Sequence, residues 1–180
     1  MTVGHARATL PDVLAARLVG HVVLVGVGNP LFGDDNAGCL VANGLAGVPG
    51  LHVIQADDVP ERHVVQIADR APDVVVLVDA VDLGAAAGSV AILEKEAMAR
   101  YEPSTHRVPL GLIAEFIQRA SGADVFVFAI QPGRVQLGAD LSPEVARSVE
   151  SLCELIRQLV TASGTSVPRD ASPAGETAPC

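Results

Sequence analysis

Residues 22–35 read VVLVGVGNPLFGDD, an apolar run that passes into a glycine-rich turn and ends on two adjacent carboxylates. Apolar residues at every position, rather than at every second one, are typical of a strand covered on both faces. The glycines and the proline that follow mark a turn. We therefore predict a buried strand over residues 22–28 and a helix over 36–45, with Asp34 and Asp35 at the junction.

The rest of the chain repeats this alternation of strands and helices. It favours a three-layer αβα sandwich around a mostly parallel, twisted sheet of five strands. About nine residues separate the strand that ends at Asp79 from the strand over 89–93. This gap is too short for a helical crossover, so we predict that the later strand runs antiparallel. The remaining predicted strands cover residues 51–55, 74–79 and 125–130, and the remaining helices 61–70, 110–120 and 143–160.

The length of 180 residues favours one domain with a substantial core. We assign this domain to residues 21–162, preceded by a helical extension over residues 1–20. Residues 163–180 are rich in Ser, Pro, Gly and Ala and show no periodicity. Such a composition cannot bury enough apolar area to offset the entropy of ordering, so we expect a disordered tail.

Charge and composition exclude several functions. The net charge is −9 and the chain has one lysine, which argues against nucleic acids and against anionic membranes as partners. No apolar run approaches the roughly 18–20 residues of a membrane span, and no secretory signal is visible, so we expect a cytoplasmic protein. The three cysteines show no C-x-x-C spacing, which disfavours a disulfide framework or a zinc ribbon.

Three residues form the candidate site: Asp35, Asp79 and His106. Asp35 and Asp79 follow two apolar runs, and ligands of open α/β sheets bind beyond the carboxyl ends of the strands. His106 stands in a loop before the helix predicted from residue 110. Two carboxylates and an imidazole suit zinc, nickel or another divalent metal with open positions. Such a metal polarises a peptide carbonyl and acidifies water, so we predict a metal-dependent hydrolase.

Each of these residues also has a purely structural interpretation. Neighbouring carboxylates cannot point the same way, so we expect Asp34 to cap the following helix while Asp35 faces the crevice. Asp79 could close a loop hydrogen bond, and a lone loop histidine such as His106 is commonly solvated. Asp82 is predicted to be a turn residue.

Other chemistries have little support in the sequence. No G-x-S-x-G elbow occurs, and no cysteine stands beside a histidine, so a serine or cysteine nucleophile is disfavoured. Gly26 and Gly28 fit the start of a dinucleotide fingerprint, but Leu31 occupies its third glycine position. Pyrophosphate at that turn would also meet Asp34 and Asp35 as like charges.

Four blocks of the chain resemble one known family over residues 22–160: VLVGVGNPLFGDDNAG, VVLVDAVDLGAAAGSV, STHRVPLGLIAEF and VFVFAIQPGRVQLG. The family is the nickel–iron hydrogenase maturation endopeptidases, especially the branch that serves formate-hydrogenlyase-type hydrogenases. The resemblance implies a twisted sheet between helices and removal of a C-terminal peptide from the hydrogenase large-subunit precursor after nickel insertion. It places the metal ligands on Asp35, Asp79 and His106, with the nickel supplied by the substrate and the site otherwise able to be empty.

One departure leaves alternatives open. Many relatives carry Asp-Gly-Gly after the second strand, where this chain has Gln55, Ala56, Asp57 and Asp58. A non-catalytic module that recognises the nickel-loaded large subunit is therefore a second hypothesis. If the domain is catalytic instead, Asp57 and Asp58 are candidates for an additional base. A third reading is peptidyl-tRNA hydrolase, which also opens with a strand and Gly-x-Gly-Asn-Pro. That enzyme should show a tyrosine and a histidine soon afterwards and a basic surface, unlike this chain.

Overall fold

The computed structural model describes residues 10–98, 101 and 108–162. His106, the predicted disordered tail over 163–180 and the first nine residues of the predicted extension lie outside this part. Within it, no helix is long and apolar enough to cross a membrane.

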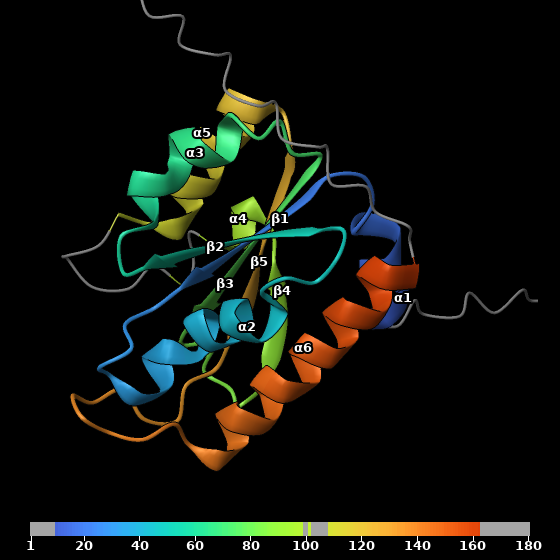
Figure 1. Ribbon diagram of the computed structural model, residues 1–180. Coiled ribbons are helices and arrows are strands. Elements are labelled where there is room, and N and C mark those ends of the chain that lie inside the picture. The colour runs from blue at the N-terminus through green and yellow to red at the C-terminus, as the bar shows by residue number, and fades with distance from the viewer. Residues whose placement is uncertain (1–9, 99–100, 102–107, 163–180) are drawn as a thin grey trace, which may run out of the picture.

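The sheet has five strands in the order β2-β1-β3-β5-β4 (Figure 1). β1 pairs in parallel with β2 and β3, and β3 pairs in parallel with β5, while β4 runs antiparallel to β5. The predicted strands and the antiparallel fourth strand are therefore confirmed. The bounds are β1 Val22–Val27, β2 Leu51–Asp57, β3 Val74–Ala80, β4 Val90–Leu93 and β5 Asp124–Ile130.

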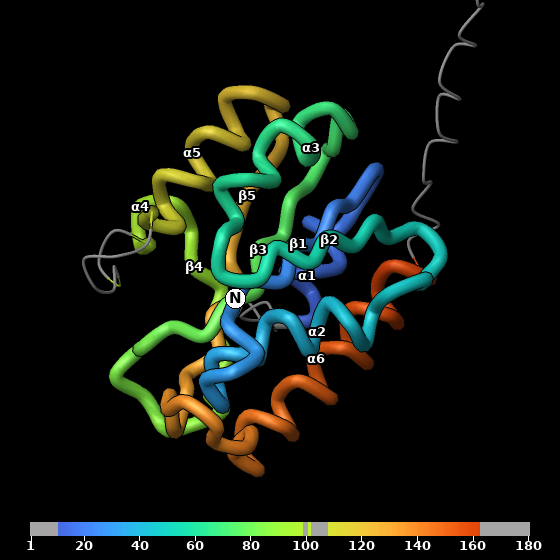
Figure 2. Tube along the Cα trace, turned by 60° about the vertical axis from the view of Figure 1, so that its left-hand side comes forward, coloured from blue at the N-terminus to red at the C-terminus, as the bar shows by residue number. Residues whose placement is uncertain are grey.

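Helices cover both faces of the sheet, as the three-layer prediction requires (Figure 2). Along β3, Val76 and Val78 point into the core beneath α1, α2 and α6, whereas Val75 and Leu77 point into the core beneath α3 and α5. Both cores are apolar, which explains the continuous hydrophobic runs. The bounds are α1 Leu10–Arg17, α2 Ala37–Leu45, α3 Val64–Ala68, α4 Lys95–Met98, α5 Leu110–Ser121 and α6 Pro143–Ala162.

Two helical segments differ from the sequence prediction. The helix predicted over residues 61–70 is a 3-10 turn, η2 (Pro60–His63), followed by the short α3. The chain then leaves the helix and reaches a positive φ of 46° at Ala71, which no hydrophobic pattern signals. The single turn α4 was not predicted, because four residues are too few to show helical periodicity.

Helix α1 packs as part of the domain core. Leu14 is fully buried and Leu18 is 1% exposed, both in the core that α6 covers. Arg17 donates to both carboxylate oxygens of Asp124, at 2.8 and 2.7 Å, and its guanidinium carbon lies 4.0 Å from the ring centroid of Phe126. These contacts tie the helix to β5, so α1 belongs to the same structural unit as the sheet.

Candidate active site

A cavity of about 420 Å³ opens at the edge where the parallel strands β1 and β3 end. It brings Asp35 and Asp79 together, as the sequence predicted. Three further carboxylates, those of Asp58, Glu61 and Asp82, line the same cavity. None of its described lining residues is Lys, Arg or His. The cavity is therefore a strongly acidic hollow with partly apolar walls.

Asp35 lies in a 3-10 turn, η1 (Gly33–Asn36), between β1 and α2. The backbone N–H of Asn29 donates to Asp35 Oδ2 at 3.0 Å, which fixes the carboxylate against the turn that follows β1. Gly28 allows this geometry, because its φ is 144° and a Cβ there would collide with the carbonyl oxygen of Asp35. The glycine turn thus folds the chain back so that Asp35 faces the cavity.

Asp79 lies near the end of β3 and is 7% exposed. Its Oδ1 accepts a hydrogen bond of 2.9 Å from the N–H of Ala80. Helix α2 packs unusually close to this strand, because a Cβ on Gly38 would collide with the carbonyl oxygens of Val78 and Val27. This close packing brings the turn that carries Asp35 to the end of β3. The sheet and α2 together therefore place both carboxylates at one cavity.

Asp34 plays a different part from the one predicted. Its side chain is fully buried and accepts four hydrogen bonds of 2.6–2.7 Å, from the N–H groups of Gly133, Arg134 and Ser142 and from the Ser142 hydroxyl. Burial raises the pKa of Asp34, but the four hydrogen bonds together lower it by more than burial raises it. The pKa of Asp34 therefore lies below its ordinary value. The prediction that Asp34 caps the following helix is wrong. It fastens the loop after β1 to the loop after β5, a long-range pairing that local sequence does not reveal.

The metal-binding hypothesis includes one ligand that lies outside the described part of the chain. His106 is not among the described residues, and the described chain resumes at Val108, which lines the cavity. Within the described residues, no group of three His, Cys, Asp or Glu side chains is placed to hold a metal ion. Asp35 and Asp79 are hard oxygen donors that suit a divalent cation, and such a site needs a further donor from elsewhere.

Cys39 lies directly under the turn that carries Asp35. Its thiol donates to the carbonyl oxygen of Gly28 at 3.5 Å, and its sulfur lies 3.9 Å from Asp57 Oδ1. Burial, together with the negative charges of Asp57, Asp79 and Asp35, raises the pKa of Cys39 to about 12. The residue is therefore a protonated thiol at neutral pH and not a nucleophile.

The structure adds residues that sequence reasoning missed or placed elsewhere. Asp58 accepts from Asn29 Nδ2 at 3.3 Å and lines the cavity, while Asp57 does not line it. Asp82 is both the predicted turn residue, accepting from Gly84 N–H at 3.1 Å, and part of the cavity lining. Gln131, missed entirely, is buried after β5, and its Oε1 accepts from the N–H of Leu83 at 2.6 Å, which fixes the loop that carries Asp82.

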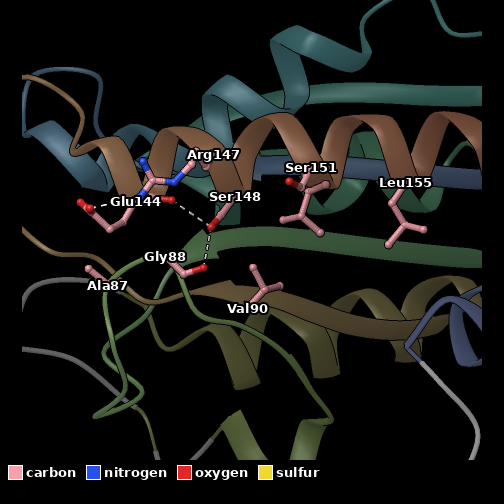
Figure 3. A pocket seen from close by; sticks show the side chains of 9 residues that line it. Ala87, Gly88, Val90, Glu144, Arg147, Ser148, Ser151 and Leu155 are labelled. Carbon is pink, nitrogen blue, oxygen red and sulfur yellow. Dashed lines mark hydrogen bonds and ion pairs between the residues drawn. The ribbon is translucent and has the colours of Figure 1, made fainter.

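A second cavity, of about 380 Å³, lies between α6 and the start of β4 (Figure 3). It has no lining residue in common with the acidic cavity. Its most reactive-looking group is the Ser148 hydroxyl, which donates to the carbonyl oxygens of Gly88 at 2.5 Å and Glu144 at 3.1 Å. The bond to Gly88 links α6 to the turn before β4, and the bond to Glu144 lies within α6, so both partners of the hydroxyl are backbone carbonyl oxygens. The acidic cavity is therefore the better candidate for the active site.

The described residues thus form an αβα sheet with two carboxylates, Asp35 and Asp79, at the strand ends that border the acidic cavity. Comparison with known families makes this specific. A family model described as hydrogenase maturation protease (HycI) matches residues 45–159. The hydrogenase 3 maturation protease of Escherichia coli K12 is 31% identical over 133 residues, which cover 72% of this chain and 85% of that protein. The chain belongs to the hydrogenase maturation protease family, whose members are endopeptidases.

Solved structures agree with this assignment. The crystal structure of the [NiFe] hydrogenase maturation protease HycI from Thermococcus kodakarensis superposes with a TM-score of 0.76 at 32% identity, over 83% of this chain and 99% of that chain. The solution structure of the endopeptidase HycI from Escherichia coli gives a TM-score of 0.69 at 27% identity, with the same coverage of 83% and 99%. The αβα fold of this chain is therefore the fold of these hydrogenase maturation proteases.

Proposed function

We propose that this chain removes the C-terminal peptide of a nickel–iron hydrogenase large-subunit precursor after nickel insertion, with the nickel brought by the substrate. The observation that carries the proposal is the meeting of Asp35 and Asp79 in one acidic cavity of a hydrogenase maturation protease. As part of the same proposal, His106 completes the ligand set and the reaction takes place in the cytoplasm.

The electrostatics of the cavity support a dependence on nickel. Asp35 and Asp79 face a hollow that also holds Asp58, Glu61 and Asp82, and like charges in a partly apolar wall repel one another. A divalent cation carried by the precursor relieves this repulsion, so the loaded precursor binds better than the empty one. Cleavage then depends on metal loading, which makes the enzyme a checkpoint in maturation.

The protein's own groups orient the reaction. The N–H groups of Asn29 and Ala80 hold the carboxylates of Asp35 and Asp79 in fixed positions before the substrate arrives. Nickel supplies Lewis acidity, which polarises the scissile carbonyl or lowers the pKa of water. Asp58 lines the cavity and remains available as an additional base, whereas Asp57 points to Cys39 and lies outside the lining.

The alternatives are weaker on these observations. An acidic cavity on a chain of net charge −9 is unsuited to the phosphates of tRNA, which opposes a peptidyl-tRNA hydrolase. A non-catalytic module that recognises the nickel-loaded large subunit would use the same cavity and is separated from the enzyme only by experiment.

The deciding experiment is a cleavage assay on nickel-loaded and nickel-free large-subunit precursor, with loss of the C-terminal peptide followed by mass spectrometry. Cleavage of the loaded form alone supports both the activity and the checkpoint. Equal cleavage of both forms overturns the nickel dependence, and binding without cleavage favours the non-catalytic module. A His106→Ala variant should bind the precursor but leave it uncut, and full processing by this variant would remove His106 from the site.

A further inference from the structure

Three large apolar side chains lie exposed beside the acidic cavity. Leu31 and Leu137 are each 64% exposed, and Val135 is 52% exposed. We call these three residues the apolar platform. Isolated exposed apolar residues are ordinary on protein surfaces, but a cluster next to a functional cavity indicates an interaction site.

The platform is built from two loops that lie side by side at the lower left of Figure 1, one after β1 and one after β5. The N–H of Gly138 donates to the carbonyl oxygen of Leu31 at 2.8 Å, and the N–H of Asp34 donates to that of Arg134 at 3.0 Å. The buried Asp34 carboxylate adds its four hydrogen bonds to the second loop. A surface held this firmly loses little conformational entropy when a partner docks.

The platform is continuous with the cavity. Val135 belongs to both, and Phe32, the neighbour of Leu31, lines the cavity from the same loop. A chain segment that enters the cavity therefore brings its parent protein against the platform. This continuity favours the protein that is being cut as the occupant over an unrelated partner.

The negative charge of the cavity lining indicates which kind of partner surface would bind beside it. The cavity lining includes the carboxylates of Asp58, Glu61 and Asp82, with no Lys or Arg among its described residues. A partner segment with acidic residues facing these carboxylates would be repelled and one with basic residues attracted, whereas the exposed Arg134 beside Val135 acts in the opposite sense on the platform itself.

From these observations we infer that the apolar platform docks the folded body of the precursor, through an apolar patch bordered by basic residues next to the segment that is cut. The inference rests on the proposed function, and it adds a recognition surface separate from the carboxylates. The enzyme then recognises both the folded body of the precursor and the nickel that the precursor carries.

The test uses the full chain and nickel-loaded large-subunit precursor, with binding measured by interferometry and cleavage measured as a function of precursor concentration. The double variant Leu31→Ser/Leu137→Ser removes most of the platform's apolar surface. Burying two leucines contributes enough for its loss to raise Kd and KM about tenfold or more, with kcat nearly unchanged. The matched control is Val13→Ser/Val19→Ser, which alters two exposed valines, 37% and 48% exposed, near the opposite end of the sheet. Circular dichroism checks that both variants remain folded.

The outcomes separate this inference from the proposed function. Binding that weakens in the platform variant but not in the control supports the inference, even if the wild-type chain binds without cutting. Equal Kd and KM in the platform variant and the wild type overturn it, although cleavage by the wild type would still support the proposed function. If the wild type binds no precursor at all, both the client and the occupant are wrong.

Discussion

Asp79 is a carboxylate that is only 7% exposed and lies in an acidic hollow. Its negative charge is therefore unfavourable for the stability of the fold, although it suits the proposed metal site. The variant Asp79→Asn keeps the shape of the side chain and an oxygen for the N–H of Ala80. We expect cleavage of the loaded precursor to fall by about 100-fold or more, because the amide is a poor ligand for a divalent cation. The melting temperature should stay the same or rise, since a buried charge is removed.

The control for that prediction is Asp57→Asn. Asp57 has a φ of 48°, a conformation that Asn tolerates as well as Asp does, and its side chain lies outside the cavity lining. Processing should therefore continue at nearly the wild-type rate. Loss of cleavage in Asp57→Asn, with normal folding, would instead assign Asp57 the role of a base.

Asp34 makes a stability prediction with a defined pH dependence. The pKa of Asp34 in the folded chain lies below its ordinary value of 3.8, because its four hydrogen bonds outweigh burial. A lowered folded-state pKa stabilises the protein above the ordinary pKa, and this stabilisation is lost as the pH falls through the folded-state value. Asp34→Asn should cost about 2–3 kcal/mol of unfolding free energy at pH 7, because an amide group then faces donors.

Urea unfolding of the Asp34→Asn variant at pH 7 and at pH 3 checks this. The difference from the wild type should be large at pH 7 and smaller at pH 3. Asp140→Asn, an exposed carboxylate on the same loop, is the control and should change little at either pH. An equal loss for Asp34→Asn at both pH values would contradict the linkage.

At the scale of elements, the close packing of α2 against the sheet decides whether the carboxylates of Asp35 and Asp79 lie at the same cavity. A Cβ at Gly38 would collide with the backbone of β1 and β3, which cannot yield as a flexible side chain can. Gly38→Ala should lower the unfolding free energy by about 2–4 kcal/mol and reduce cleavage, because α2 must move away from the sheet. Chemical denaturation and the precursor assay measure the two effects.

The matched substitution is Gly111→Ala in α5. Its nearest neighbour would be the Cβ of Met98 at 3.4 Å, so the new methyl group meets only a side chain. Alanine favours a helix over glycine by up to about 1 kcal/mol, so the variant should be as stable as the wild type or slightly more stable. A large loss of stability in both variants would mean that crowding at Gly38 is not the cause.

The elements also show what the sequence could reveal. Continuous apolar runs predicted the three central strands β1, β3 and β5, the alternation of strands and helices predicted β2 and β4, and a short gap predicted the antiparallel direction of β4, because these signals are local. The role of Asp34 was not predictable, since its partner Ser142 lies 108 residues away. The same limit applies to Glu61 and Asp82, which join the cavity only because the sheet brings their loops to one edge. Local patterns thus predicted that Asp35 and Asp79 lie at the ends of strands, but they did not predict which other residues line the cavity around them.

At the scale of the whole molecule, the chain combines a net charge of −9 with an acidic cavity and an apolar platform beside it. Long-range attraction then acts on a basic region of the client before contact, while the platform acts only after contact. Salt screens the first effect and leaves apolar burial largely intact. The two contributions to recognition are therefore separable by ionic strength.

We predict that kcat/KM for the loaded precursor falls about tenfold between roughly 0.05 and 0.5 M sodium chloride, because screening slows association. Glu61→Gln/Asp82→Asn should weaken this salt dependence by removing two of the cavity's charges. Glu150→Gln/Glu154→Gln changes the net charge equally on α6, which contributes no residue to the cavity lining, and should leave the slope nearly unchanged. Equal slopes for the two double variants would mean that net charge, rather than the cavity, steers the client, and a wild-type rate independent of salt would remove electrostatic steering altogether.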